Sequence, residues 1–130
     1  MSTDPELERR HLLVVDDEPY IGRIIQLKLE RAPYAVDIAT DVDSARERLL
    51  SPAPIDLVLL DIMLPQGSGL DLLAEMRELP HRNETPVFML TAKGQVADRE
   101  RAAELGATDF LTKPFSPNEL LERINELFED

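Results

Sequence analysis

Residues 56–65 read Asp-Leu-Val-Leu-Leu-Asp-Ile-Met-Leu-Pro, and this stretch decides the fold class. Its apolar run does not alternate with polar residues, which is typical of a strand that is covered on both faces of a parallel sheet. Similar runs recur along the chain and predict five strands in all, at 12–16, 34–39, 56–60, 86–91 and 109–112. The run at 34–39 is the least apolar, so we expect this strand at an edge of the sheet.

Residues that are typical of helix starts and helix ends lie between these predicted strands. Pro19 suits a first helical position, because its missing N–H has no partner to lose there. Residues 68–71 and 116–119 form capping boxes, Pro80 ends the third helix, and Gly106 ends the fourth. The strict alternation predicts an α/β fold, a flavodoxin-like (βα)5 three-layer sandwich. Its parallel five-stranded sheet should have the order 2-1-3-4-5.

Length and composition narrow the class of protein. The chain has 130 residues, and we expect a flexible lead-in over 1–10 followed by one domain over 11–130. A net charge of −12 disfavours direct binding to nucleic acid or to anionic membranes. The absence of cysteine excludes disulfides and thiolate chemistry. No signal peptide or membrane-spanning run is recognisable, so a cytoplasmic location is expected. Whether the chain is a complete protein or a fragment stays open.

Acidic residues follow the first and third predicted strands, where Asp16, Asp17 and Asp61 stand. The carboxyl ends of these strands flank the crevice where ligands bind in such folds. Like charges that are held together require a cation, and Mg²⁺ prefers oxygen ligands. We expect Asp17 and Asp61 to bind Mg²⁺ directly, Asp16 through water, and the Met63 carbonyl to complete the protein ligands. Mn²⁺ or Ca²⁺ could substitute. Alternatively, the first acids only cap the helix that follows them.

Asp61 is also the candidate nucleophile, since a carboxylate can attack phosphorus and form an acyl phosphate. Lys113 and Thr91 end two further runs and could neutralise and hydrogen-bond the phosphoryl oxygens. The Lys113–Pro114 bond is a candidate cis peptide. Each residue also has an ordinary interpretation: Lys113 as a surface lysine, and Thr91 as a strand-end residue.

Taken together, the motifs resemble the receiver domain of two-component response regulators, from about His11 to Phe128. The resemblance rests on four segments in order, at 14–18 (VVDDE), 60–65 (LDIMLP, with Gly69 following), 90–92 (LTA) and 106–115 (GATDFLTKPF). Each segment is weak evidence alone, but the ordered set is specific.

The resemblance implies that Asp61 accepts a phosphoryl group from a sensor histidine kinase or a histidine phosphotransfer protein. It also implies slow hydrolysis of the acyl phosphate, so that the domain acts as a signalling switch rather than as an enzyme. It assigns metal binding to Asp16, Asp17, Asp61 and the Met63 carbonyl. Phosphoryl contacts fall to Thr91, the Ala92 backbone and Lys113. Thr91 and Phe110 would form the conformational switch, although Phe110 could be ordinary core.

The resemblance leaves the output open between a further effector domain and a docking protein. Four charged residues resemble the dimerisation face of regulators that carry winged-helix DNA-binding domains, namely Arg101, Asp109, Glu119 and Arg123. A phosphorylation-dependent homodimer is therefore one hypothesis, and a solvated charged surface is the other.

Other classes of protein compete with a phosphorylated receiver. A phosphorylation-independent docking module would keep the fold without the chemistry. An aspartyl-phosphate phosphatase would normally need a second acid where Met63 stands. A flavin mononucleotide carrier is disfavoured, because Asp16, Asp17 and Glu18 would repel its phosphate.

Overall fold

The computed structural model describes residues 9–30, 33–92 and 94–129 of the chain. The strands are β1 (Arg10–Val15), β2 (Tyr34–Ala39), β3 (Leu57–Asp61), β4 (Met63–Leu64), β5 (Gly67–Ser68), β6 (Val87–Thr91) and β7 (Asp109–Thr112). The helices are α2 (Pro19–Leu29), α3 (Val42–Leu50), α4 (Gly69–Glu78), α5 (Val96–Glu104) and α6 (Pro117–Phe128).

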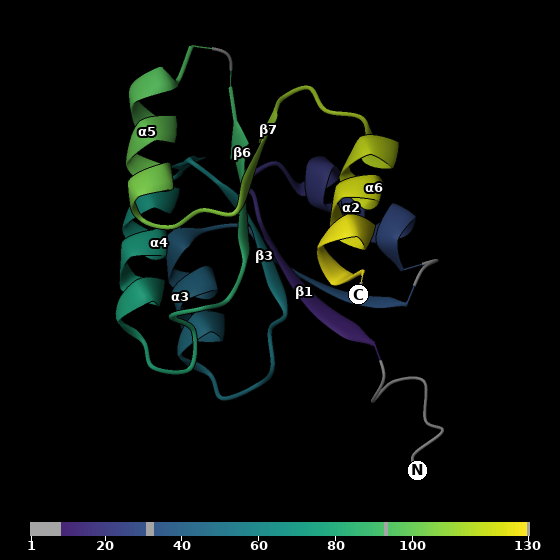
Figure 1. The fold of residues 1–130 in the computed structure, drawn as a ribbon, viewed down its shortest axis with the longest axis horizontal. Helices are drawn as coiled ribbons and strands as arrows, with labels where there is room; N and C mark the ends of the chain where they lie inside the picture. Colours follow the sequence, from purple (N-terminus) through teal and green to yellow (C-terminus); the bar gives the residue numbers. More distant parts are fainter. Residues whose placement is uncertain (1–8, 31–32, 93, 130) are drawn as a thin grey trace.

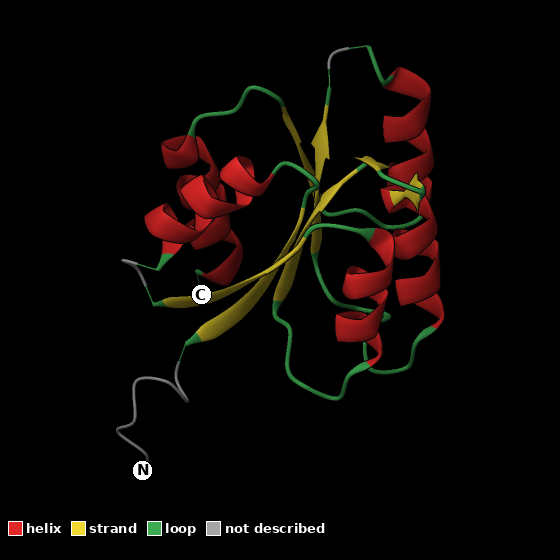
Figure 2. Ribbon diagram, turned by 180° about the vertical axis from the view of Figure 1, so that it is seen from behind, coloured by secondary structure: helices red, strands yellow, loops and turns green. Residues whose placement is uncertain are grey.

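The main sheet of the described chain is parallel and has the order β2-β1-β3-β6-β7. The predicted order 2-1-3-4-5 is therefore confirmed, with β6 and β7 as its fourth and fifth strands. The least apolar strand, β2, lies at the edge as expected. Helices α2 and α6 cover one face of the sheet, while α3, α4 and α5 cover the other (Figure 1). Figure 2 shows the same three layers from behind.

The two faces of the sheet bury separate apolar clusters. One cluster packs Val58 and Leu60 of β3 against α3 and α4, and the other packs Leu57 and Leu59 against α2 and α6. All residues of β3 are buried. This double burial is the physical reason why the run at 57–60 is continuously apolar.

The predicted helix starts are also present. Pro19 occupies the first turn of α2, and the hydroxyls of Ser68 and Ser116 accept backbone N–H groups at the starts of α4 and α6. Helix α5 ends before Gly106, which has a φ of 85°, a conformation that favours glycine.

Two details differ from expectation. Arg10 already belongs to β1, because it pairs with Tyr34 and its N–H donates to the Pro33 carbonyl at 3.1 Å. The expected lead-in over 1–10 therefore overlaps the sheet at Arg10, and residues 1–8 lie outside the described residues. The short antiparallel pair of β4 and β5 was not expected from the sequence, since two-residue strands leave no periodic pattern.

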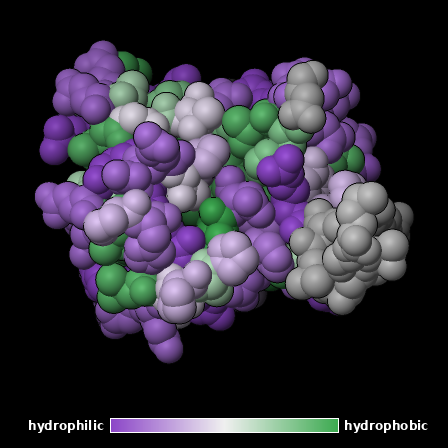
Figure 3. All heavy atoms as spheres, turned by 60° about the horizontal axis from the view of Figure 1, so that its bottom comes forward, coloured by the Kyte–Doolittle hydropathy of each residue, from purple (hydrophilic) through white to green (hydrophobic). Residues whose placement is uncertain are grey.

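Among the residues that the structure describes, no helix is both long and apolar enough to cross a membrane. On the face seen in Figure 3, hydrophobic side chains form separate patches within a largely hydrophilic surface.

Candidate functional site

The strand register brings the polar strand ends to one edge of the sheet. Val15 of β1 is level with Leu60, directly before Asp61, and Asp61 is level with Leu90, directly before Thr91. Asp16 follows β1, and Lys113 follows β7. Parallel strands end on the same side, so residues far apart in the sequence become neighbours.

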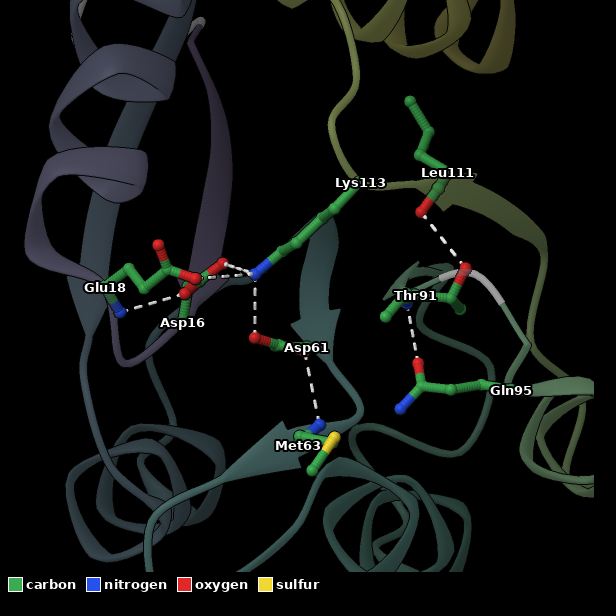
Figure 4. Close-up of polar contacts among 9 residues, drawn as sticks. Asp16, Glu18, Asp61, Met63, Thr91, Gln95, Leu111 and Lys113 are labelled. Carbon is green, nitrogen blue, oxygen red and sulfur yellow. Dashed lines mark hydrogen bonds and ion pairs between the residues drawn. The ribbon is translucent and has the colours of Figure 1, made fainter.

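Lys113 connects the two acidic strand ends. Its ammonium nitrogen lies 2.7 Å from Asp16 Oδ2 and 2.9 Å from Asp61 Oδ2, with Glu18 Oε1 further away at 3.8 Å (Figure 4). The Asp16 side chain is fully buried, and those of Asp61 and Lys113 are 11% and 19% exposed. Lys113 is therefore not an ordinary surface lysine. The Lys113–Pro114 peptide bond is cis.

Burial and charge act against each other at this cluster. Burial raises the pKa of Asp61 above its usual value, although the bonds from Lys113 and from the Met63 N–H partly offset the rise. Repulsion from the Asp16 carboxylate raises the pKa of Asp61 further. Burial alone would lower the pKa of Lys113, but its bonds to Asp16 and Asp61 outweigh that effect and raise it. The ammonium is thus firmly charged and compensates two carboxylates.

A compact acidic group adjoins this ion pair. Asp16, Asp17 and Glu18 each offer a carboxylate oxygen within 4.8 Å of the others, and Asp17 and Glu18 are exposed. These hard oxygen donors fit Mg²⁺, Mn²⁺ or Ca²⁺. Asp61 is not part of this group but shares Lys113 with Asp16. Glu18 was absent from the predicted ligands and belonged, with Asp16 and Asp17, only to the helix-capping alternative.

The helix-capping alternative holds only in part. Asp16 Oδ1 accepts the Glu18 N–H at 2.9 Å, directly before α2. Glu18 itself is the N-cap residue, yet its side chain makes no capping bond. Its carboxylate instead faces the Lys113 ammonium.

The loop after Asp61 approaches that residue closely. The Met63 N–H donates to Asp61 Oδ1 at 3.2 Å, and Met63 as a residue is 66% exposed. Gly69 returns to the end of β3, where its N–H donates to the Ile62 carbonyl at 2.7 Å. A Cβ at Gly69 would lie only 2.0 Å from the Asp61 carbonyl oxygen. Only glycine allows this approach, which accounts for its place in the motif.

The expected phosphoryl contacts at β6 face other partners in this structure. Thr91 is fully buried, and its hydroxyl donates to the Leu111 carbonyl at 3.4 Å, with Thr112 Oγ1 at 3.5 Å. The backbone N–H of Ala92 donates to Gln95 Oε1 at 2.6 Å (Figure 4). Gln95 was not predicted, because a glutamine in a loop carries no motif of its own.

Phe110, the expected switch aromatic, is half-buried on β7 and packs against the cluster that faces α3, α4 and α5. In this structure Phe110 is therefore packed as a partly buried core residue. The guanidinium of Arg99 on α5 lies over its ring, 5.3 Å from the ring centre. Sequence reasoning missed Arg99, since nothing in the pattern of α5 distinguishes it from other charged residues on that helix.

The candidate dimer residues pair within the chain. Arg123 contacts Asp109 at 3.0 Å and Glu119 at 2.9 Å, and it also donates to the Phe110 carbonyl at 2.9 Å. Arg101 instead pairs with Glu104 of its own helix, at 3.4 Å. The structure therefore brings Asp109, Glu119 and Arg123 together, whereas Arg101 pairs with a different residue.

Comparison with known proteins decides the family. Residues 12–125 match the response regulator receiver domain family. The chain belongs to this family. It is 50% identical over 113 residues to the transcriptional regulatory protein DltR of Streptococcus agalactiae, covering 87% of this chain and 49% of DltR. It is 45% identical over 115 residues to the phosphate regulon transcriptional regulatory protein PhoB of Escherichia coli, covering 88% of this chain and 50% of PhoB.

The fold of this receiver domain agrees with solved structures. The chemotaxis response regulator CheY4 of Vibrio cholerae superposes with a TM-score of 0.85 at 28% identity, covering 92% of this chain and 99% of CheY4. The chain spans about half the length of the curated relatives that it matches.

Proposed function

We propose that this receiver domain accepts a phosphoryl group on Asp61 from the phosphohistidine of a sensor histidine kinase or a histidine phosphotransfer protein. The observation that carries the proposal is the Lys113 ammonium, which is bonded to Asp61 at 2.9 Å and to the buried Asp16 at 2.7 Å. Such a charge can neutralise a phosphoryl oxygen that arrives at Asp61, and neutralisation supplies much of the rate in phosphoryl transfer.

Phosphoryl transfer from histidine to Asp61 requires little covalent chemistry from the protein, whose main part is to position and neutralise the reacting groups. An Asp61 carboxylate oxygen attacks phosphorus, the P–N bond to histidine breaks, and its electron pair returns to the imidazole nitrogen. The product on the domain is an acyl phosphate. In the reset, water attacks phosphorus, the P–O bond to Asp61 breaks, and inorganic phosphate leaves with the carboxylate restored. On this proposal the domain is a switch that is phosphorylated and reset, rather than an enzyme that turns over a separate substrate.

A divalent cation belongs to the same proposal. Asp16, Asp17, Asp61 and the Met63 carbonyl would hold Mg²⁺, with Glu18 close enough to Asp16 and Asp17 to contribute. Bound Mg²⁺ supplies positive charge to the phosphoryl oxygens. Mn²⁺ or Ca²⁺ would fit the same oxygen donors.

The switch would act through Thr91 and Phe110. The Thr91 hydroxyl now donates to Leu111, which directly follows Phe110 on β7. A phosphoryl oxygen offers a stronger acceptor than a carbonyl, so the hydroxyl would leave Leu111 for Asp61. Space beside β6 would then change, and the half-buried Phe110 would move inward. Phosphorylation thereby selects one of two arrangements of β7 and α5.

The proposal also covers what the phosphorylated receiver domain controls. Because similar proteins of about twice this length are named transcriptional regulators, the receiver would control a further domain or a docking protein in the cytoplasm. The domain itself, with a net charge of −12, would not bind nucleic acid or a membrane surface. A phosphorylation-dependent homodimer would exchange the Arg123 pairs with Asp109 and Glu119 for pairs between two copies.

Incubation with Mg²⁺ and acetyl phosphate, followed by intact-mass measurement, tests the acceptor. Wild type should gain the mass of one phosphoryl group, and Asp61→Asn should not. Asp43→Asn is the matched control, because the Asp43 side chain is 88% exposed on α3 and should leave labelling unchanged. Labelling of Asp61→Asn would remove Asp61 as the acceptor. Absence of labelling in wild type would favour a docking module, and multiple turnover of simple phosphate esters would favour a phosphatase.

A second experiment separates acceptance from switching. Thr91→Ala should still be labelled, but labelling should no longer change the amide exchange of β7 and α5. Sedimentation of the labelled wild type tests the homodimer, and an unchanged monomer at high concentration would count against it.

A further inference from the structure

The Ala92 amide, to which the resemblance to receiver domains assigns a phosphoryl contact, already donates its N–H to a side chain. Its N–H donates to Gln95 Oε1 at 2.6 Å, and Figure 4 shows the Gln95 side chain extended back toward the end of β6. Gln95 is the N-cap residue of α5, yet its side chain makes no capping bond to that helix. Gly94, with a φ of 87°, supplies the turn that lets Gln95 fold back. The side chain therefore serves Ala92 instead of its own helix.

One N–H cannot donate fully to two acceptors. Gln95 offers a neutral amide oxygen, whereas a phosphorylated Asp61 would offer a charged oxygen, and hydrogen bonds to charged acceptors are roughly twice as strong. We propose that Gln95 is an internal competitor for the phosphoryl group at Ala92, so that phosphorylation of Asp61 displaces the Gln95 side chain. The inference rests on the proposed function, because it requires Asp61 to carry the phosphoryl group.

Displacement of Gln95 has a route to the switch aromatic. The Gln95 carbonyl accepts the Arg99 N–H at 3.0 Å, which forms the first turn of α5. The Arg99 guanidinium in turn lies over the Phe110 ring, 5.3 Å from its centre. Gln95 thus joins the amide at the end of β6 to the helix that covers Phe110. Displacement would move the Gln95 side chain at the start of α5 at the same moment as the Ala92 amide turns to the phosphoryl group, while the backbone bond from Arg99 to Gln95 stays in place.

The test compares Gln95→Ala with Val96→Ala in the full chain. Val96 is the next residue, is 62% exposed and begins α5, so its truncation perturbs the same turn without touching Ala92. The first measurement is amide hydrogen exchange at Ala92 by NMR without any phosphoryl donor. The second is the affinity for beryllofluoride with Mg²⁺, a stable analogue of the phosphoryl group. Acetyl phosphate labelling of wild type is run alongside.

Gln95→Ala should speed exchange at Ala92 and tighten beryllofluoride binding by about threefold, which corresponds to the net contribution of one exposed hydrogen bond. Val96→Ala should change neither quantity. Unchanged exchange at Ala92 in Gln95→Ala would overturn the inference whatever Asp61 does. Equal beryllofluoride affinity in wild type and Gln95→Ala would overturn the competition while leaving phosphorylation intact. If wild type neither labels nor binds the analogue, the proposed function fails first, and the inference falls with it.

Discussion

Replacing Lys113 with methionine removes the ammonium that compensates two buried carboxylates. Asp16 is fully buried and Asp61 nearly so, and both accept hydrogen bonds from Lys113 Nζ at 2.7 and 2.9 Å. Methionine has a similar length but no charge, so the carboxylates are left facing each other. Removing one partner of a buried ion pair costs about 3 kcal/mol or more, because the remaining charge is uncompensated.

Urea unfolding in the presence of a chelator measures this loss. With a denaturant slope of about 1.5 kcal/mol per molar, a loss of about 3 kcal/mol lowers the urea midpoint by about 2 M. Lys28→Met is the matched control, since Lys28 lies on α2 away from the acidic cluster, and it should change stability by about 0.5 kcal/mol or less. Adding Asp61→Asn to Lys113→Met should recover part of the loss.

The pH dependence of stability, compared between wild type and Lys113→Met, gives a second check. A carboxyl group whose pKa is raised by folding contributes stability at low pH that is lost as the pH rises. Burial already raises the pKa of Asp61 in wild type, and loss of Lys113 raises it further. The stability difference between Lys113→Met and wild type should therefore be largest at neutral pH and shrink toward about pH 4. An unchanged urea midpoint at neutral pH, or an equal loss at both pH values, would refute the compensation argument.

Three further changes test other parts of the structure. Gly69→Ala would place a Cβ 2.0 Å from the Asp61 carbonyl, so it should cost at least about 1–3 kcal/mol in thermal unfolding and slow acetyl phosphate labelling; normal labelling would contradict the close approach. Arg82, which is 3% exposed, donates to three carbonyls around the end of α3, so Arg82→Met should destabilise by about 2–3 kcal/mol while leaving labelling intact. Burial raises the pKa of Tyr34, so stability should fall as the pH rises above about 10, and Tyr34→Phe should flatten that fall in urea midpoints. If the urea midpoint falls equally with pH in wild type and in Tyr34→Phe, titration of groups other than Tyr34 causes the fall.

The sequence by itself determined the sheet and the main members of the site. Continuous apolar runs identify strands that are buried on both faces, and strict alternation with helices makes those strands parallel. Parallel strands end at one edge, so Asp16, Asp61, Thr91 and Lys113 could be grouped without coordinates. The ion pairs of Lys113 with Asp16 and Asp61 agree with that grouping.

Only the tertiary structure decided where the side chains at that edge point. Thr91 donates to β7 rather than toward Asp61, and the Ala92 amide is taken by Gln95. Glu18 joins the acidic group that sequence reasoning limited to Asp residues. Strand periodicity reports which face a residue occupies, because burial repeats along the chain. A hydrogen bond instead depends on loop conformation and on one rotamer, and neither leaves a repeating signal in the sequence.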